Sequence, residues 1–135
     1  MTMLNDIAAG LGKAERIAVV SHADPDPDAI GSTLGLTLAL RALGKTVVAL
    51  NDDAPPAEIA FLPGADTLSK QVPDGFEPQV LVCLDSSDTV RLGKVAAPLL
   101  PSGIPVYNVD HHVTNLNYGS LTWTAYASRS TPVLT

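Results

Sequence analysis

The sequence contains a single cysteine, which excludes an intramolecular disulfide. Cys83 lies in the apolar run QVLVCLD (79–85), where a small buried hydrophobic residue fits. A reducing compartment suits such a thiol, so we expect a cytoplasmic protein and assign Cys83 no catalytic role.

Basic residues are also few. Eight Lys and Arg stand against fourteen Asp and Glu, which gives a formal net charge of −6. Binding of long duplex nucleic acid depends on Lys and Arg side chains that neutralise phosphates, so this balance argues against such a partner. A small anionic substrate held through a metal ion is compatible with it.

Long apolar runs are missing as well. Residues 1–17 lack a basic segment followed by an apolar one, and no run approaches the roughly 18 apolar residues that a bilayer span requires. We therefore expect neither secretion nor membrane insertion. A hydrophobic content of 46% predicts a folded chain, and a length of 135 residues predicts one domain, 1–135, with a core of its own.

Helical and strand-like segments alternate along this chain. Apolar spacing and end signals predict helices at residues 3–12, 28–43, 55–62 and 89–100. Compact apolar runs predict buried strands at residues 16–22, 45–50, 79–85 and 104–112. Strands separated by helical segments imply right-handed crossovers, so we expect an α/β fold: an open, mostly parallel sheet with helices on both faces.

Acids and histidines follow three of the four predicted strands. They are Asp24, Asp26 and Asp28 with His22 after the first strand, Asp85 after the third, and Asp110, His111 and His112 after the fourth. In open parallel sheets, ligands bind beyond the carboxyl ends of the strands. We therefore expect these side chains to meet at one edge of the sheet.

The stretch SHADPDPDAIGS (21–32) holds three aspartates that repel one another and are costly to desolvate. Carboxylate oxygens and imidazole nitrogens are the usual ligands of Mn²⁺, Mg²⁺ or Zn²⁺ where thiolates are absent. A pair of divalent ions would supply the positive charge that keeps the aspartates ionised and close together.

Each fragment also has a simpler explanation. Asp28 is suited to an N-cap or to the first turn of a helix, DPDPD to an exposed turn, and Asp85 to capping the next helix. His111 and His112 are equally consistent with hydrogen-bonded polar residues at a strand end. The joint placement of all these residues favours a site over four separate structural roles.

Three motifs in order, SHADPDPDAIGS, VCLDSSDTVRLG (82–93) and NVDHHVTNLNYG (108–119), resemble the DHH phosphoesterase family over residues 16–123. The nanoRNase and pAp-phosphatase type, related to RecJ-like exonucleases, is the most similar variety. The resemblance implies a Rossmann-like three-layer domain. It also implies hydrolysis of phosphoester bonds in short single-stranded oligoribonucleotides or in pAp by a two-metal mechanism, with Mn²⁺ as the expected ion and Mg²⁺ as the alternative.

The resemblance also implies a role for each matching residue. His22 and Asp26 would bind one metal ion, Asp28 and His111 the other, and Asp85 would bridge the two. His112 would contact the substrate phosphate or assist proton transfer, and Asp110 would orient a histidine. Ser32 would donate a hydrogen bond to phosphate near the start of a helix. Asp24 stands where the family commonly has Asn, and it receives no ligand role.

Two parts of the family pattern are absent: the fourth motif, with an aspartate that completes the second metal site, and the C-terminal substrate-binding domain. We therefore expect the domain to be incomplete at its C-terminus, with an open sheet edge that would favour a homodimer. The alternatives are a catalytically impaired metal- or nucleotide-binding domain, and a relative of the inorganic pyrophosphatases or the cyclic-dinucleotide phosphodiesterases.

Overall fold

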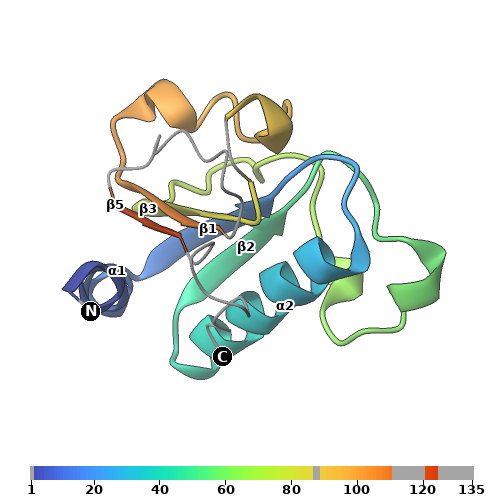
Figure 1. Ribbon diagram of the computed structural model, residues 1–135, viewed down its shortest axis with the longest axis horizontal. Coiled ribbons are helices and arrows are strands. Elements are labelled where there is room, and N and C mark those ends of the chain that lie inside the picture. Colours follow the sequence, from blue (N-terminus) through green and yellow to red (C-terminus); the bar gives the residue numbers. More distant parts are fainter. Residues whose placement is uncertain (1, 87–88, 111–120, 125–135) are drawn as a thin grey trace.

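A computed structural model describes residues 2–86, 89–110 and 121–124 of the chain. Within them, five strands form one sheet in the order β2-β1-β3-β4-β5, and all neighbours are parallel (Figure 1). The strands are β1 (Arg16–Ser21), β2 (Thr46–Leu50), β3 (Val80–Leu84), β4 (Val106–Asp110) and β5 (Leu121–Thr124). The predicted fold class and the first four strands are confirmed. β5 was not predicted, because four residues are too short a run to show a periodicity.

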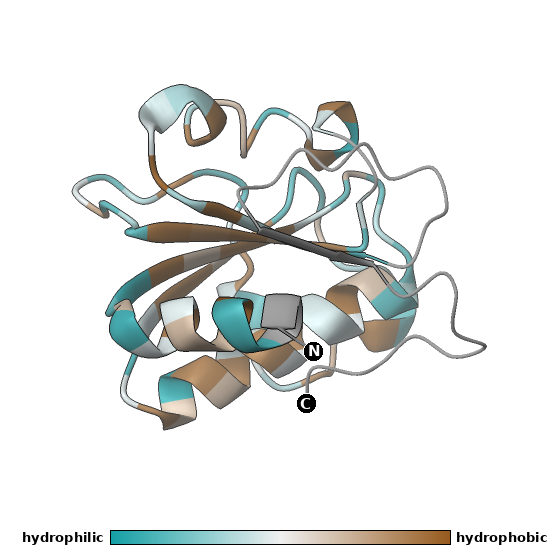
Figure 2. Ribbon diagram, turned by 60° about the vertical axis from the view of Figure 1, so that its left-hand side comes forward, coloured by the Kyte–Doolittle hydropathy of each residue, from teal (hydrophilic) through white to brown (hydrophobic). Residues whose placement is uncertain are grey.

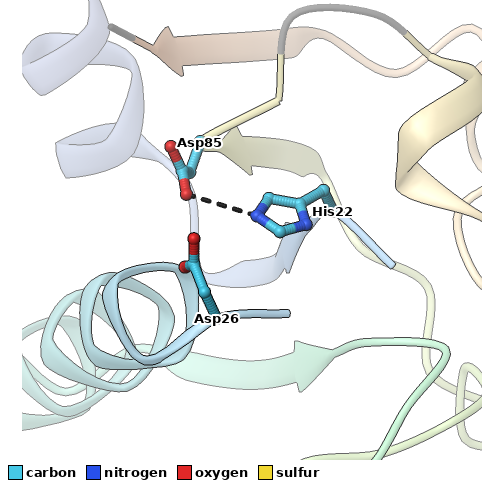
Figure 3. A group of neighbouring side chains, drawn as sticks. All are labelled: His22, Asp26 and Asp85. Carbon is cyan, nitrogen blue, oxygen red and sulfur yellow. Dashed lines mark ion pairs between the residues drawn. The ribbon is translucent and has the colours of Figure 1, made fainter. Parts of the chain in front are cut away.

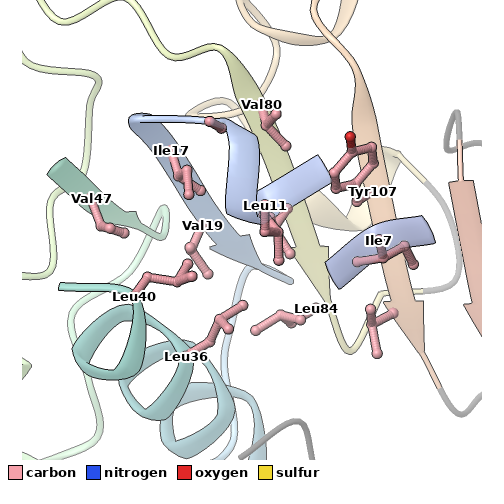
Figure 4. Packing of buried hydrophobic residues seen from close by; sticks show 13 residues of the cluster. Ile7, Leu11, Ile17, Val19, Leu36, Leu40, Val47, Val80, Leu84 and Tyr107 are labelled. Carbon is pink, nitrogen blue, oxygen red and sulfur yellow. The ribbon is translucent and has the colours of Figure 1, made fainter. Parts of the chain in front are cut away.

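One face of the sheet is covered by two α-helices, α1 (Thr2–Lys13) and α2 (Pro27–Ala42), close to the predicted bounds (Figure 1). Alternate residues of β1, such as Ile17 and Val19, point to this face because side chains alternate along a strand. They pack against Leu11 of α1 and against Leu36 and Leu40 of α2 (Figure 4).

The opposite face is covered by residues 90–102, and here the predicted helix at 89–100 is wrong. The segment forms two 3₁₀ turns, η3 (Val90–Leu92) and η4 (Leu100–Ser102), joined by further turns. Gly93 breaks the helix with a φ of +82°, and the Asp52 carboxylate accepts the backbone N–H groups of Lys94 and Val95 at 2.8 and 2.7 Å. These bonds replace those of a helix, while apolar side chains still bury against the sheet.

The third predicted helix, at residues 55–62, is reduced to a single turn. Residues 55–62 hold only the 3₁₀ turn η1 (Ala57–Ile59), which is followed by η2 (Ala65–Thr67). Pro55 and Pro56 begin this segment and Pro63 follows it, so any helix between them is confined to residues 57–62. The segment packs beside α2, where Ile30, Leu34 and Ala65 form a small buried cluster.

Hydropathy follows these layers. Figure 2 shows hydrophobic strands between the helices on one side and the turns on the other, with hydrophilic loops at the sheet edges. Cys83 lies in the middle of β3 and is fully buried, as predicted. Among the described residues, no helix is both long and apolar enough to cross a bilayer.

Candidate metal site

The candidate site lies beyond the carboxyl ends of β1 and β3, which are neighbours in the sheet. Ser21, the last residue of β1, is in register with Leu84, the last residue of β3. The residues that follow, His22 and Asp85, therefore leave the sheet side by side. This is the predicted edge of the sheet, and the register explains why residues 63 positions apart meet there.

Three side chains converge at this edge: His22, Asp26 and Asp85 (Figure 3). Each offers one ligand atom, and these atoms lie within 4.8 Å of one another. His22 Nε2 is 3.4 Å from Asp85 Oδ2. One imidazole and two carboxylates within this distance form a donor set that suits a borderline or hard divalent cation.

The backbone determines which nitrogen of His22 faces the acids. His22 Nδ1 lies 2.8 Å from the carbonyl oxygen of Ala23, which can only accept, so Nδ1 carries the hydrogen. In the neutral ring, Nε2 then presents a lone pair toward the Asp85 carboxylate. A divalent cation between this nitrogen and the carboxylate oxygen, which lie 3.4 Å apart, could be bound by both.

Asp26 has a second role at the start of α2. It is the N-cap residue, and its Oδ1 accepts the backbone N–H of Ala29 at 2.8 Å. Pro27 follows at the first helical position, where a missing N–H costs nothing. The positive end of the helix dipole, which attracts anionic groups, lies at the exposed Asp26 carboxylate. The N-cap is therefore Asp26, while Asp28 is an acid of the first turn.

Asp85 combines burial with an unusual backbone. Its exposed fraction is 8%, and its φ is +55°, in the left-handed region that non-glycine residues rarely adopt. Aspartate tolerates this conformation better than most residues. A strained residue at the end of a strand is typical of functional sites. The conformation turns the chain sharply after β3.

The remaining predicted residues are placed as follows. Asp28 is exposed in the first turn of α2 and stands outside the group of three. Ser32 is exposed on α2, and Asp110 is buried at the end of β4, with an exposed fraction of 2%. Asp24 is exposed, has a φ of +54° and donates its N–H to Asp53. His111 and His112 lie outside the described residues.

The segment that follows β2 also contributes to this edge, although it was not predicted to do so. Asn51 and Asp53 hold the loop after β1, through the His22 carbonyl and the Asp24 N–H, and Asp52 holds the segment at Lys94. Ligands bind beyond the carboxyl ends of parallel strands, and this holds for β2 as well. The polar residues NDD (51–53), which directly follow β2, could therefore have been predicted to lie at this edge. Asn108 in β4, which is fully buried, was also missed.

A parallel α/β sheet with an imidazole and carboxylates beyond its strand ends defines an open α/β domain with a candidate metal centre at the edge where such sheets bind ligands. Residues 16–131 match the N-terminal domain of the DHH family. The chain belongs to this family.

Two curated relatives carry the same name, bifunctional oligoribonuclease and PAP phosphatase NrnA. The protein of Thermus thermophilus is 43% identical over 78% of this chain and 30% of its own length. That of Bacillus subtilis is 30% identical over 90% of this chain and 37% of its own length. The chain thus spans about a third of the length of these relatives.

Solved structures show the same fold. An exopolyphosphatase-related protein from Bacteroides fragilis superposes with a TM-score of 0.85 at 26% identity, over 96% of this chain and 40% of that protein. RecJ from Thermus thermophilus, solved with Mn²⁺, superposes with a TM-score of 0.59 at 21% identity, over 98% of this chain and 19% of RecJ.

Proposed function

We propose that the chain is the metal-binding part of a phosphoesterase that hydrolyses short oligoribonucleotides or pAp. The observation that carries this proposal is the convergence of His22, Asp26 and Asp85 within 4.8 Å, in a chain of the DHH family. The names of the two curated relatives supply the substrate class. The cytoplasm, where short RNA fragments arise, is the proposed compartment.

The proposed metal ligands are those that the family resemblance implies. His22 and Asp26 would hold one divalent ion, Asp28 and His111 a second, and Asp85 would bridge them. The described donors fit the first ion, because Nε2 of His22 and both carboxylates face one another. When bound, such a pair would supply Lewis-acid activation of water and neutralise developing charge on phosphate. Mn²⁺ is the proposed ion, and Mg²⁺ the alternative.

The other predicted residues have proposed roles around this centre. His112 would contact the phosphate of the substrate or transfer a proton to the leaving oxygen. The buried Asp110 would orient a histidine by accepting a hydrogen bond from its ring. The exposed Ser32 would donate its hydroxyl hydrogen to a phosphate oxygen.

The test is Mn²⁺-dependent release of mononucleotides from a short oligoribonucleotide. Wild type should release them, and Asp85→Ala should lose the activity by at least two orders of magnitude, because the carboxylate shared by both ions is gone. Equal rates for the two proteins would refute the proposal. Mn²⁺ binding without turnover would favour the alternative, a metal- or nucleotide-binding domain. Phosphate release from pAp and from pyrophosphate should also be compared, because a relative of the inorganic pyrophosphatases would release phosphate from pyrophosphate instead of from pAp.

A further inference from the structure

A fully buried asparagine follows β2, next to the strand that carries His22. The Asn51 amide Nδ2 donates to the His22 carbonyl at 2.9 Å, to Ser21 Oγ at 3.0 Å and to the Ser21 carbonyl at 3.3 Å. Its Oδ1 accepts the backbone N–H of Asp53 at 2.9 Å. Asn51 therefore holds the backbone from which the His22 side chain projects.

A second fully buried asparagine lies in β4, next to the strand that leads to Asp85. The Asn108 amide Nδ2 donates to the carbonyls of Cys83 and Ser86, each at 3.2 Å. These two carbonyls flank Asp85 along the chain. The contacts bridge the end of β3 and the residue after the turn, so they hold the left-handed conformation of Asp85 from both sides.

The two asparagines come from the strands that flank the β1–β3 pair, at different levels: Asn51 follows β2, and Asn108 lies within β4, in register with Cys83 of β3. The candidate ligands His22 and Asp85 follow β1 and β3, the two strands between them. We propose that Asn51 and Asn108 are positioning residues, which fix the separation between His22 Nε2 and the Asp85 carboxylate. This inference rests on the proposed function, since the separation matters only if the two side chains bind one ion.

The amide group is suited to this task for a physical reason. Each Nδ2 faces backbone carbonyls that are buried at the end of a strand, and a buried carbonyl without a donor is costly. An amide donates to two of them at once from a short, stiff side chain. Outer residues that orient metal ligands typically change metal affinity by 10–100-fold when they are replaced.

The experiment measures Mn²⁺ affinity by titration calorimetry for wild type, Asn51→Ala and Asn108→Ala. Leu40→Ala is the matched control, because it removes a buried side chain from the core under α2, away from the site. We expect each asparagine variant to weaken Mn²⁺ binding about 10–100-fold. We expect the control to leave the affinity within about twofold, although its thermal stability falls as much or more. Asn51→Ser and Asn108→Ser replace any alanine variant that does not fold.

A second readout uses the metal-free protein: the ring-nitrogen NMR shifts of His22 and the carboxyl-carbon shift of Asp85. They should change in the asparagine variants and stay constant in Leu40→Ala. If wild type binds Mn²⁺ and the asparagine variants bind it as the control does, the positioning role is refuted while the proposed function stands. If wild type binds no Mn²⁺, the proposed function fails, and unchanged NMR shifts would then refute the positioning role as well.

Discussion

His22 Nε2 lies 3.4 Å from Asp85 Oδ2, although the two residues belong to separate strand ends. In the neutral ring, Nδ1 of His22 donates its hydrogen to the Ala23 carbonyl. Nε2, the nitrogen that faces Asp85, is therefore the one able to bind a metal ion. A cation at this point would satisfy the lone pair and the carboxylate together.

Mn²⁺ should stabilise the folded chain. Because the ligands come together only on folding, an ion at about 100 times its dissociation constant adds about 2.7 kcal/mol to the free energy of unfolding. Thermal unfolding with and without Mn²⁺ measures this, and a chelator should reverse it. His22→Ala should reduce the shift strongly. A shift of equal size in His22→Ala would show that Mn²⁺ binds elsewhere.

The two roles of Asp26 can be separated by two substitutions. Asp26→Ala removes both the metal ligand and the N-cap, whereas Asp26→Ser keeps a cap for the N–H of Ala29. We expect Asp26→Ala to lower the free energy of unfolding of the metal-free protein by about 0.5–2 kcal/mol, and Asp26→Ser by only about a few tenths of a kcal/mol. Both should weaken Mn²⁺ binding. Chemical denaturation without metal measures the first effect and calorimetry the second; full Mn²⁺ affinity in Asp26→Ser would exclude Asp26 as a ligand.

The edge of the sheet could be predicted because its signals are local. Buried parallel strands appear as short apolar runs, and the letters directly after them, His22 and Asp85 among them, show what the edge carries. The hydrogen bonds that hold these loops could not be predicted. Asn51 and Asn108 act on backbone carbonyls of neighbouring strands, and a strand order that is not sequential hides such neighbours.

The helix predicted at residues 89–100 is wrong for the same reason, because the structure of this segment depends on a residue that is distant in the sequence. Apolar spacing there is compatible with a helix, but the Asp52 carboxylate takes the N–H groups of Lys94 and Val95. The intrinsic preference of these residues for a helix is weak, and such a long-range contact can override it. Asp52 is 42 residues away from Lys94, so no window of sequence contains both partners.

Gly93→Ala should destabilise the protein. The φ of +82° costs an L-residue about 1–2 kcal/mol, and an added Cβ would collide with the Asp52 carboxylate. Gly12→Ala is the control, because Gly12 lies in α1 with no atom within 4 Å of its new Cβ. We expect that variant to gain up to about 1 kcal/mol. Urea unfolding measures the free energy of unfolding of both variants. Equal values for the two would contradict the positive φ of Gly93.

Two buried threonines of α2 should respond in opposite directions to replacement by valine. Thr33 Oγ1 donates to the Ala29 carbonyl at 2.8 Å, whereas Thr37 Oγ1 has no hydrogen-bond partner among the described residues. Both side chains are almost fully buried, so the two substitutions match in size and in burial. Thr33→Val loses a hydrogen bond and should lower the free energy of unfolding by about 1 kcal/mol. Thr37→Val removes a buried polar atom without breaking a bond and should raise it by about 1 kcal/mol. Urea unfolding of the two variants measures the difference, and a loss of stability in Thr37→Val would show that its hydroxyl is bonded in the folded protein.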